Sequence, residues 1–122
     1  MTDRYVLVTG GTRRIGFAIT CALAASGFQV LAQSRQPAAM AESLPAAATL
    51  LVHGNDSAAD ARAMVLAAHR FARERSGHLV GIVANAAAFE YDVAVSRADG
   101  LLDEQLRANL ASPLAAWREF LA

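Results

Sequence analysis

The sequence predicts an α/β fold, in which a parallel β-sheet carries helices on both faces. Two observations lead to this prediction. Short apolar segments of strand-like composition alternate four times with segments that place apolar residues at helical spacing. The first apolar segment, residues 5–9, is apolar on both faces, as a strand inside a parallel sheet should be. We therefore expect about four strands in the order 3-2-1-4, half of a doubly wound sheet, with residues 1–122 as one unit.

The expected elements follow one another regularly along the chain. The strands are residues 5–9, 29–32, 49–53 and 79–84. A first helix begins near Ile15 and stops at Gly27, a residue type that suits a helix C-terminus. A short alanine-rich helix is expected after Pro37, and Pro45 ends it.

Two longer helices complete the pattern. Ser57 is the expected N-cap of the first, with Asp60 as a weaker capping-box partner. The apolar stripe of this helix is Ala61, Met64, Val65, Ala68, Phe71 and Ala72. The last helix spans about residues 101–121, and Pro113 marks a kink or a restart within it.

A glycine-containing turn joins the first strand to the first helix. It reads Thr9-Gly10-Gly11-Thr12-Arg13-Arg14-Ile15-Gly16. Gly10 permits a tight turn, and Gly16 lets the helix start approach the strand or a phosphate closely. The unpaired N–H groups of a helix N-terminus suit an anion. The flanking strand and helix favour a Rossmann-type nucleotide site over an ordinary strand-to-helix turn, which stays the alternative.

The end of the second strand indicates which nucleotide. An NAD site places a carboxylate about 20 residues after the glycines, whereas an NADP site places an arginine there. Here Ser34 and Arg35 occupy that place, and no carboxylate occurs between the glycine turn and Glu42. Arg13 adds a second cation near the same ribose, and guanidinium groups suit a 2′-phosphate. NADP(H) is the predicted cofactor; two solvated surface arginines are the alternative.

These residues resemble the short-chain dehydrogenase/reductase family. The closest likeness is to its pteridine-reductase and dihydromonapterin-reductase branch, where an arginine also replaces the middle glycine, as Arg14 does here. The resemblance runs from about Tyr5 to the chain end and corresponds to the N-terminal half of a family member. It implies cofactor contacts by Gly10, Thr12, Arg13, Arg14, Ile15, Gly16, Ser34, Arg35, Asn55, Asp56, Asn85, Ala86 and Ala87.

The resemblance also implies substrate and relay positions. Arg14 would reach toward a pterin, and Phe89 falls where pteridine reductases stack an aromatic ring on it. A plain core role for Phe89 is the alternative. Asn109 matches the family's helix asparagine, which holds a water in a proton relay; it could instead cap or kink the helix.

Two departures from the family pattern stand out. Asn55 occupies the place of an aspartate that contacts adenine, with Asp56 one residue late. The catalytic Tyr-x-x-x-Lys is absent, because all 11 basic residues are arginine and the two tyrosines, Tyr5 and Tyr91, lack the following lysine. We therefore expect the 122-residue chain to be inactive by itself.

Composition excludes several other classes of protein. The 11 basic residues balance 11 acidic ones, which argues against nucleic-acid binding. No apolar run approaches the roughly 18 residues of a membrane span. Histidine and cysteine show no metal-ligand spacing. The single cysteine, Cys21, suits a reducing cytoplasm.

The predicted function is NADPH-dependent hydride transfer to a carbonyl or C=N bond of a small-molecule substrate, with a reduced pterin as the first candidate. This chain would supply the cofactor-binding part, and family resemblance implies a homo-oligomer formed through the last helix. The alternative is a non-catalytic module that binds a nucleotide or a protein.

Overall fold

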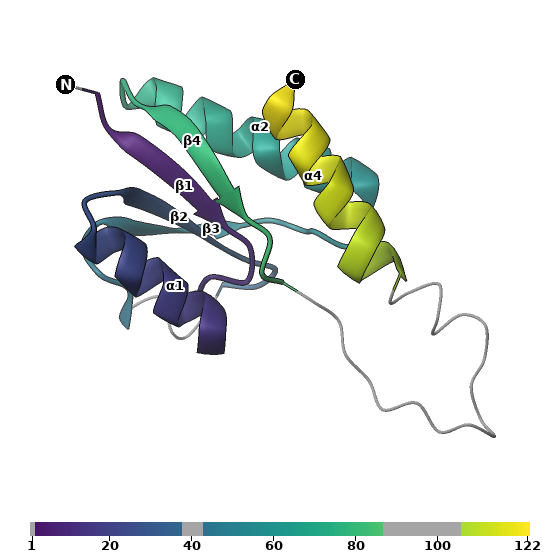
Figure 1. The fold of residues 1–122 in the computed structure, drawn as a ribbon, viewed down its shortest axis with the longest axis horizontal. Coiled ribbons are helices and arrows are strands. Elements are labelled where there is room, and N and C mark those ends of the chain that lie inside the picture. The colour runs from purple at the N-terminus through teal and green to yellow at the C-terminus, as the bar shows by residue number, and fades with distance from the viewer. Residues whose placement is uncertain (1, 38–42, 87–105) are drawn as a thin grey trace.

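Four parallel strands run through the middle of the molecule in the order β3-β2-β1-β4 (Figure 1). The computed structural model describes residues 2–37, 43–86 and 106–122. The strands are β1 (Arg4–Val8), β2 (Gln29–Ser34), β3 (Ala48–Val52) and β4 (His78–Val83). The predicted strand order and parallel direction are confirmed, so the carboxyl ends of all four strands meet at one edge of the sheet.

The strand boundaries differ slightly from the predicted ones. Three strands begin and end one residue earlier, because ladder pairing already includes Arg4 with His78 and Val30 with Ala48. β2 continues two residues beyond its predicted end, because Gln33 and Ser34 pair with Leu51 and Val52 of β3. This extension carries two polar side chains to the sheet edge where the other strands end.

Helices cover both faces of the sheet, as predicted. α1 (Arg14–Ala25) lies on one face, whereas α2 (Ala58–Glu74) and α4 (Ser112–Leu121) pack side by side on the other (Figure 1). Gly27 follows α1 with φ +94°, a left-handed conformation that glycine adopts without strain. The predicted alanine-rich helix falls mainly on residues 38–42, which lie outside the described residues.

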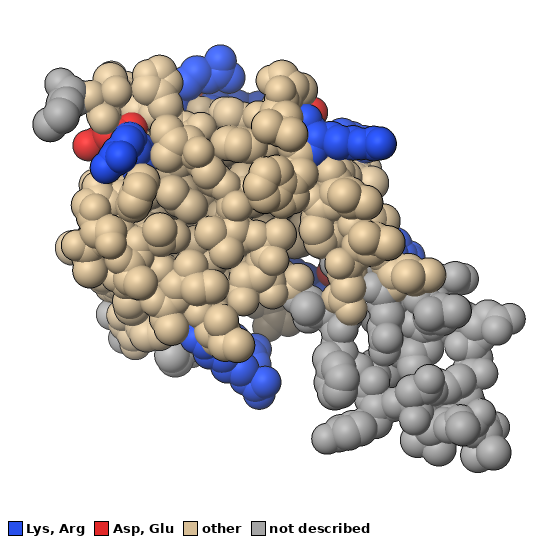
Figure 2. Space-filling view, in the orientation of Figure 1, with Lys and Arg blue, Asp and Glu red and all other residues tan. Residues whose placement is uncertain are grey.

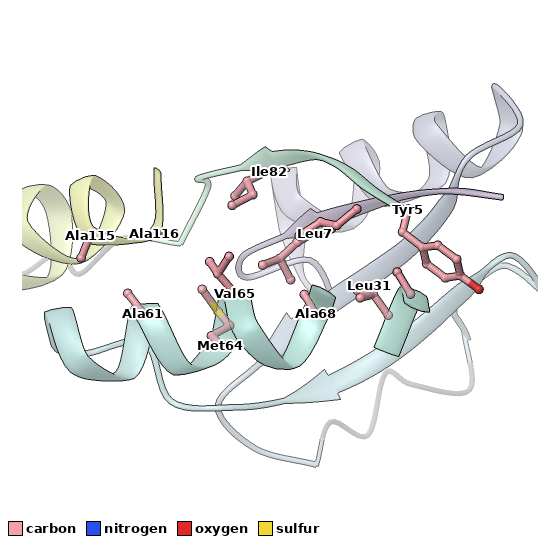
Figure 3. Packing of buried hydrophobic residues seen from close by; sticks show 12 residues of the cluster. Tyr5, Leu7, Leu31, Ala61, Met64, Val65, Ala68, Ile82, Ala115 and Ala116 are labelled. Carbon is pink, nitrogen blue, oxygen red and sulfur yellow. The ribbon is translucent and has the colours of Figure 1, made fainter. Parts of the chain in front are cut away.

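The core divides into two layers, one on each face of the sheet. Tyr5 and Leu7 of β1 point to the layer shared with α2 and α4 (Figure 3). Val6 and Val8, the intervening residues, point to the layer under α1. β1 is therefore buried on both faces, as its uninterrupted apolar sequence indicated. The predicted stripe of α2 faces the first layer with Ala61, Met64, Val65, Ala68 and Ala72 buried and Phe71 packed against them.

The predicted N-cap of α2 is confirmed. Ser57 has extended backbone angles, and its hydroxyl accepts a hydrogen bond of 3.1 Å from the amide of Asp60. This bond satisfies one of the N–H groups that the first helical turn leaves without a backbone acceptor.

Replacing this cap should measurably destabilise the fold. Ser57→Ala removes the acceptor and should lower the free energy of unfolding by about 1 kcal/mol, measured by urea denaturation. Ser26→Ala, at an exposed serine after α1, is the matched control. An unchanged denaturation midpoint in Ser57→Ala would show that the cap contributes nothing.

The last helix confirms the predicted irregularity at Pro113. A π-helical turn, η2 (Arg107–Ala111), runs directly into α4, and the amide of Ser112 donates to the carbonyl of Arg107. Pro113 lies in the first turn of α4, where its missing N–H is tolerated. Residues 101–105 of the predicted helix lie outside the described residues.

The surface and helix lengths add two observations. On the face shown in Figure 2, the arginines form separate groups at the periphery of a broad uncharged surface. Within the described residues, none of the helices combines the length and apolar character that crossing a bilayer would require.

Candidate functional site

The turn between β1 and α1 holds the backbone very close to neighbouring segments. Gly10 has φ +63°, which favours glycine. A Cβ added to Gly16 would overlap the carbonyl oxygen of Gly10 and come within 2.6 Å of Asn85 Nδ2. A Cβ on Gly11 would lie 2.9 Å from the hydroxyl of Thr20, which donates to the carbonyl of Gly11. At any of these three positions, a residue larger than glycine would therefore displace the turn.

Arg14 departs from the usual conformation of a residue with a side chain. Its φ is +52°, and it stands at the position where the motif has its middle glycine. A left-handed conformation costs a non-glycine residue about 1–2 kcal/mol. The side chain is exposed and lines the cavity described below. Such strain at a cavity wall is typical of functional sites.

The loop after β4 is tied to this turn through Thr9. The Thr9 hydroxyl accepts hydrogen bonds of 2.9 Å from the amides of both Asn85 and Ala86. In return, Asn85 Nδ2 donates to the carbonyls of Thr9 and Gly10 at 3.1 and 3.4 Å. The buried threonine and the asparagine thus fix two loops that are 76 residues apart in sequence.

The end of β2 is tied to the same turn through Gln33. Its side-chain oxygen accepts from the amide of Gly10 at 2.9 Å, and its main-chain carbonyl accepts from the amide of Gly11 at 3.0 Å. Its side-chain nitrogen donates to the carbonyl of His53 at 2.7 Å. Gln33 was not among the predicted site residues; a polar residue at the end of an apolar strand is the signal that could have indicated it.

Two polar pairs complete the wall at the end of β3. Arg35 NH1 lies 3.1 Å from Asp56 Oδ1, and both side chains are about two-thirds exposed. Asn55 is held from the helical layer, because the single O–H of the buried Ser112 lies within hydrogen-bond distance of both its side-chain oxygen, at 2.7 Å, and its main-chain oxygen, at 2.8 Å. Ser112 is a second residue that the sequence did not indicate, since the contact spans 57 positions.

These segments enclose a cavity of about 540 Å³ at the carboxyl edge of the sheet. Twelve of the thirteen residues predicted to contact a cofactor line it, together with Gln33. The predicted residues that line it are Gly10, Thr12, Arg13, Arg14, Ile15, Gly16, Ser34, Arg35, Asn55, Asp56, Asn85 and Ala86.

Three other predicted positions are not among the described residues that line the cavity. Ala87 and Phe89 lie outside the described residues. Asn109 is in η2, on an exposed part of the helical layer, and is absent from the described lining of the cavity.

The chemistry of the cavity suits an anionic ligand. Arg13, Arg14 and Arg35 contribute three guanidinium groups, against the one carboxylate of Asp56. The N–H groups in the first turn of α1 have no acceptor within the helix, and the helix dipole adds partial positive charge there. No group of three or more histidine, cysteine, aspartate or glutamate residues in the described part of the chain could hold a metal ion.

Comparison with known proteins then decides the family. The model of the family described as short chain dehydrogenase matches residues 4–122. The chain belongs to this family. No curated protein matches it.

Solved structures of this family share the fold. A short-chain dehydrogenase/reductase from Serratia marcescens is 28% identical, with a TM-score of 0.81, over 98% of this chain and 50% of that one. The Pseudomonas aeruginosa RhlG/NADP active-site complex is 25% identical, with a TM-score of 0.84, over 99% of this chain and 48% of that one. FolM alternative dihydrofolate reductase 1 from Brucella canis, complexed with NADP, is 27% identical, with a TM-score of 0.80, over 98% and 49%.

The chain therefore spans about half the length of the solved structures that it resembles. A FolM alternative dihydrofolate reductase is among these structures, which agrees with the resemblance to pteridine reductases that the sequence showed.

Proposed function

We propose that this chain is the dinucleotide-binding part, residues 1–122, of an NADPH-dependent short-chain oxidoreductase. The observation that carries the proposal is the cavity, where the glycine turn, the start of α1 and Arg35 come together. The family membership and the NADP complexes among similar structures support it.

The described residues fit a dinucleotide. Because Gly16 has no side chain, Gly10 and Asn85 pack directly against the start of α1. Ile15 and Gly16 line the cavity there, and the N–H groups of a helix N-terminus suit a pyrophosphate. Asn85 and Ala86 face this turn from the loop after β4, where they would border the nicotinamide ribose. Asn55 and Asp56 line the cavity beyond β3, where an adenine would lie.

Arg35 is the residue that we propose selects NADP(H) over NAD(H). Its guanidinium lies at the end of β2, the place where an NAD site has a carboxylate. It is about two-thirds exposed and paired only with Asp56 in the described ion pairs, so a 2′-phosphate can reach it. Arg13, also exposed, would supply a second cation.

The proposed reaction is hydride transfer to a carbonyl or C=N group. Bound NADPH would supply the hydride. The 122 residues would bind and orient the cofactor, but they contain no lysine and so lack the Tyr-x-x-x-Lys pair that protonates the product. A reduced pterin is the first substrate to test, since Arg14 lines the cavity and a FolM reductase is among the similar structures.

The activity test compares two forms of the protein. The 122-residue chain should bind NADPH without oxidising it, whereas the protein as its source makes it should oxidise NADPH with a dihydropterin or a carbonyl substrate. NADPH absorbance follows the reaction. Turnover by the 122-residue chain that Tyr91→Phe abolishes would contradict the proposal, because the chemistry would then reside in this half.

A non-catalytic nucleotide-binding module is the second candidate. The absence of lysine from a chain with a well-formed cavity favours it. It predicts the same NADPH binding but no turnover by the protein as its source makes it. Intact mass of that protein, compared with 12.8 kDa, shows whether further chain is present to supply the missing residues.

We also propose that the protein forms a homo-oligomer through its last helix. Leu110 of η2 and three residues of α4, Leu114, Trp117 and Leu121, are large apolar residues with 45–73% exposure. They recur at helical spacing, so they form one apolar stripe.

The single cysteine supports a reducing, cytoplasmic location.

Replacing Arg14 should raise the stability of the fold and weaken NADPH binding. Arg14→Gly removes the strain of φ +52° and should raise the free energy of unfolding by about 0.5–1 kcal/mol. It also removes a guanidinium from the cavity, so NADPH binding should weaken by about five- to tenfold. Denaturation and NADPH titration measure the two effects.

Ser76→Gly is the matched control for this prediction. Ser76 also has a positive φ, +58°, but lies before β4 and away from the cavity. Its replacement should raise stability without changing NADPH affinity. Equal NADPH affinity in Arg14→Gly and the wild type would show that Arg14 does not contact the ligand.

A further inference from the structure

Among the described residues that line the cavity, Gln33 is the most deeply buried polar side chain. It is 1% exposed, and both ends of its carboxamide are hydrogen-bonded. The oxygen accepts from Gly10 of the glycine turn, and the nitrogen donates to the carbonyl of His53, just after β3. A single side chain of β2 therefore links the glycine turn, which follows β1, to the segment that follows β3.

The carboxamide suits this place for a chemical reason. The site presents an N–H group on one side and a carbonyl oxygen on the other, so it needs an acceptor and a donor on one planar group. In a buried setting, a missing partner leaves a polar group unsatisfied, which is costly. The carboxamide thus sets the separation of the Gly10 amide and the His53 carbonyl, in addition to the backbone bonds that join both segments to β2.

The two joined segments border different parts of the cavity. Gly10 begins the turn that leads to the N–H groups of α1, whereas His53 precedes Asn55 and Asp56 by two and three residues. Under the proposed function, these are the pyrophosphate and the adenosine ends of the cofactor. A ligand that touches both ends can bind well only when their separation matches its own.

We infer that Gln33 is a positioning residue that sets the separation between the glycine turn and the β3 end of the cavity, and so governs affinity for a complete dinucleotide. This inference rests on the proposed function. Gln33 acts through Gly10 and His53, so ligands confined to one end of the cavity should be insensitive to its replacement.

Gln33→Met tests this with two ligands of different reach. Methionine has a similar length and volume but cannot replace either hydrogen bond. NADPH spans both ends and should bind about tenfold more weakly. Adenosine 2′-monophosphate reaches only the Arg35 and Asn55 end and should change by less than about twofold. Gln29→Met, at the opposite end of β2, is the matched control and should alter neither affinity.

Gln33→Glu provides a second test, which can still be made if Gln33→Met fails to fold. The protonated carboxyl can accept from Gly10 and donate to His53, as the carboxamide does. The ionised form cannot donate, and burial raises the pKa of the introduced carboxyl. NADPH affinity relative to the wild type should therefore be nearly normal near pH 5 and fall about tenfold toward pH 8. The neighbouring ionisable groups, His53 and Asp56, and the ligand phosphate are the same in both proteins, so comparison with the wild type at each pH removes effects that the two proteins share.

The outcomes separate the inference from the function on which it rests. Equal loss of NADPH and adenosine 2′-monophosphate in Gln33→Met would mean that the cavity as a whole is damaged, and would overturn the positioning role. So would unchanged NADPH affinity, or a flat relative pH profile in Gln33→Glu. A wild-type protein that binds adenosine 2′-monophosphate but not NADPH, or neither, would instead overturn the proposed function.

Discussion

Arg35→Asp should lower the ratio of NADPH affinity to NADH affinity by about 100-fold. The substitution removes charge-assisted hydrogen bonds to the 2′-phosphate and places a carboxylate where that phosphate would lie. It also leaves Asp56 without its ion-pair partner, so two carboxylates would border the site. NADH lacks the 2′-phosphate, and a carboxylate at the end of β2 suits its free ribose hydroxyl. Calorimetric titration with both cofactors measures the ratio.

The matched control for this prediction is Arg62→Asp. Arg62 is exposed on α2 and is not part of the described cavity lining, so the same charge change there should leave the ratio unaltered. Proportional weakening of NADPH and NADH in Arg35→Asp would show that Arg35 does not recognise the 2′-phosphate.

Gly16→Ala should abolish measurable NADPH binding and lower the free energy of unfolding by about 1–3 kcal/mol. The added methyl group would overlap the carbonyl oxygen of Gly10 and crowd Asn85, and both neighbours are themselves held by hydrogen bonds. The turn would have to move away from the loop after β4, which would open the cavity wall. Thermal denaturation and NADPH titration check the two effects.

Gly81→Ala provides the comparison. A Cβ at Gly81 would meet the Val6 side chain at 3.9 Å, an ordinary contact, and Gly81 lies within β4 away from the cavity. It should leave NADPH affinity unchanged. If Gly16→Ala bound NADPH as well as Gly81→Ala does, the close approach at the turn would not matter for binding.

Much of this molecule could be predicted from local sequence patterns. Residues 5–9 were recognisable as a strand because a parallel sheet buries both faces of its central strands, and Ser57 was recognisable as a cap from its place before an apolar stripe. The strand order followed from the doubly wound pattern that the alternating elements and the glycine turn indicated. Arg35 was recognisable because only one helix and one strand separate it from the glycine turn, so its distance from the turn along the chain could be predicted.

Contacts between distant segments were beyond the reach of these patterns. Gln33 bonds Gly10 and His53, which are 23 and 20 positions away, and only the register of three adjacent strands brings them together. Ser112 meets Asn55 because α4 packs over the sheet beside α2, a packing that no local period encodes. The sequence marked Arg14 as a departure from glycine, but its positive φ became visible only with the backbone of the turn.

Under the proposed function, the cavity binds NADPH and prefers it to NADH. Calorimetric titration of the wild-type protein with each cofactor tests this most directly. We expect saturable NADPH binding that is about 10- to 100-fold tighter than NADH binding, because under the proposed function Arg35 and Arg13, which line the cavity, would meet the 2′-phosphate. Equal affinity for the two cofactors, or no binding of either, would contradict it.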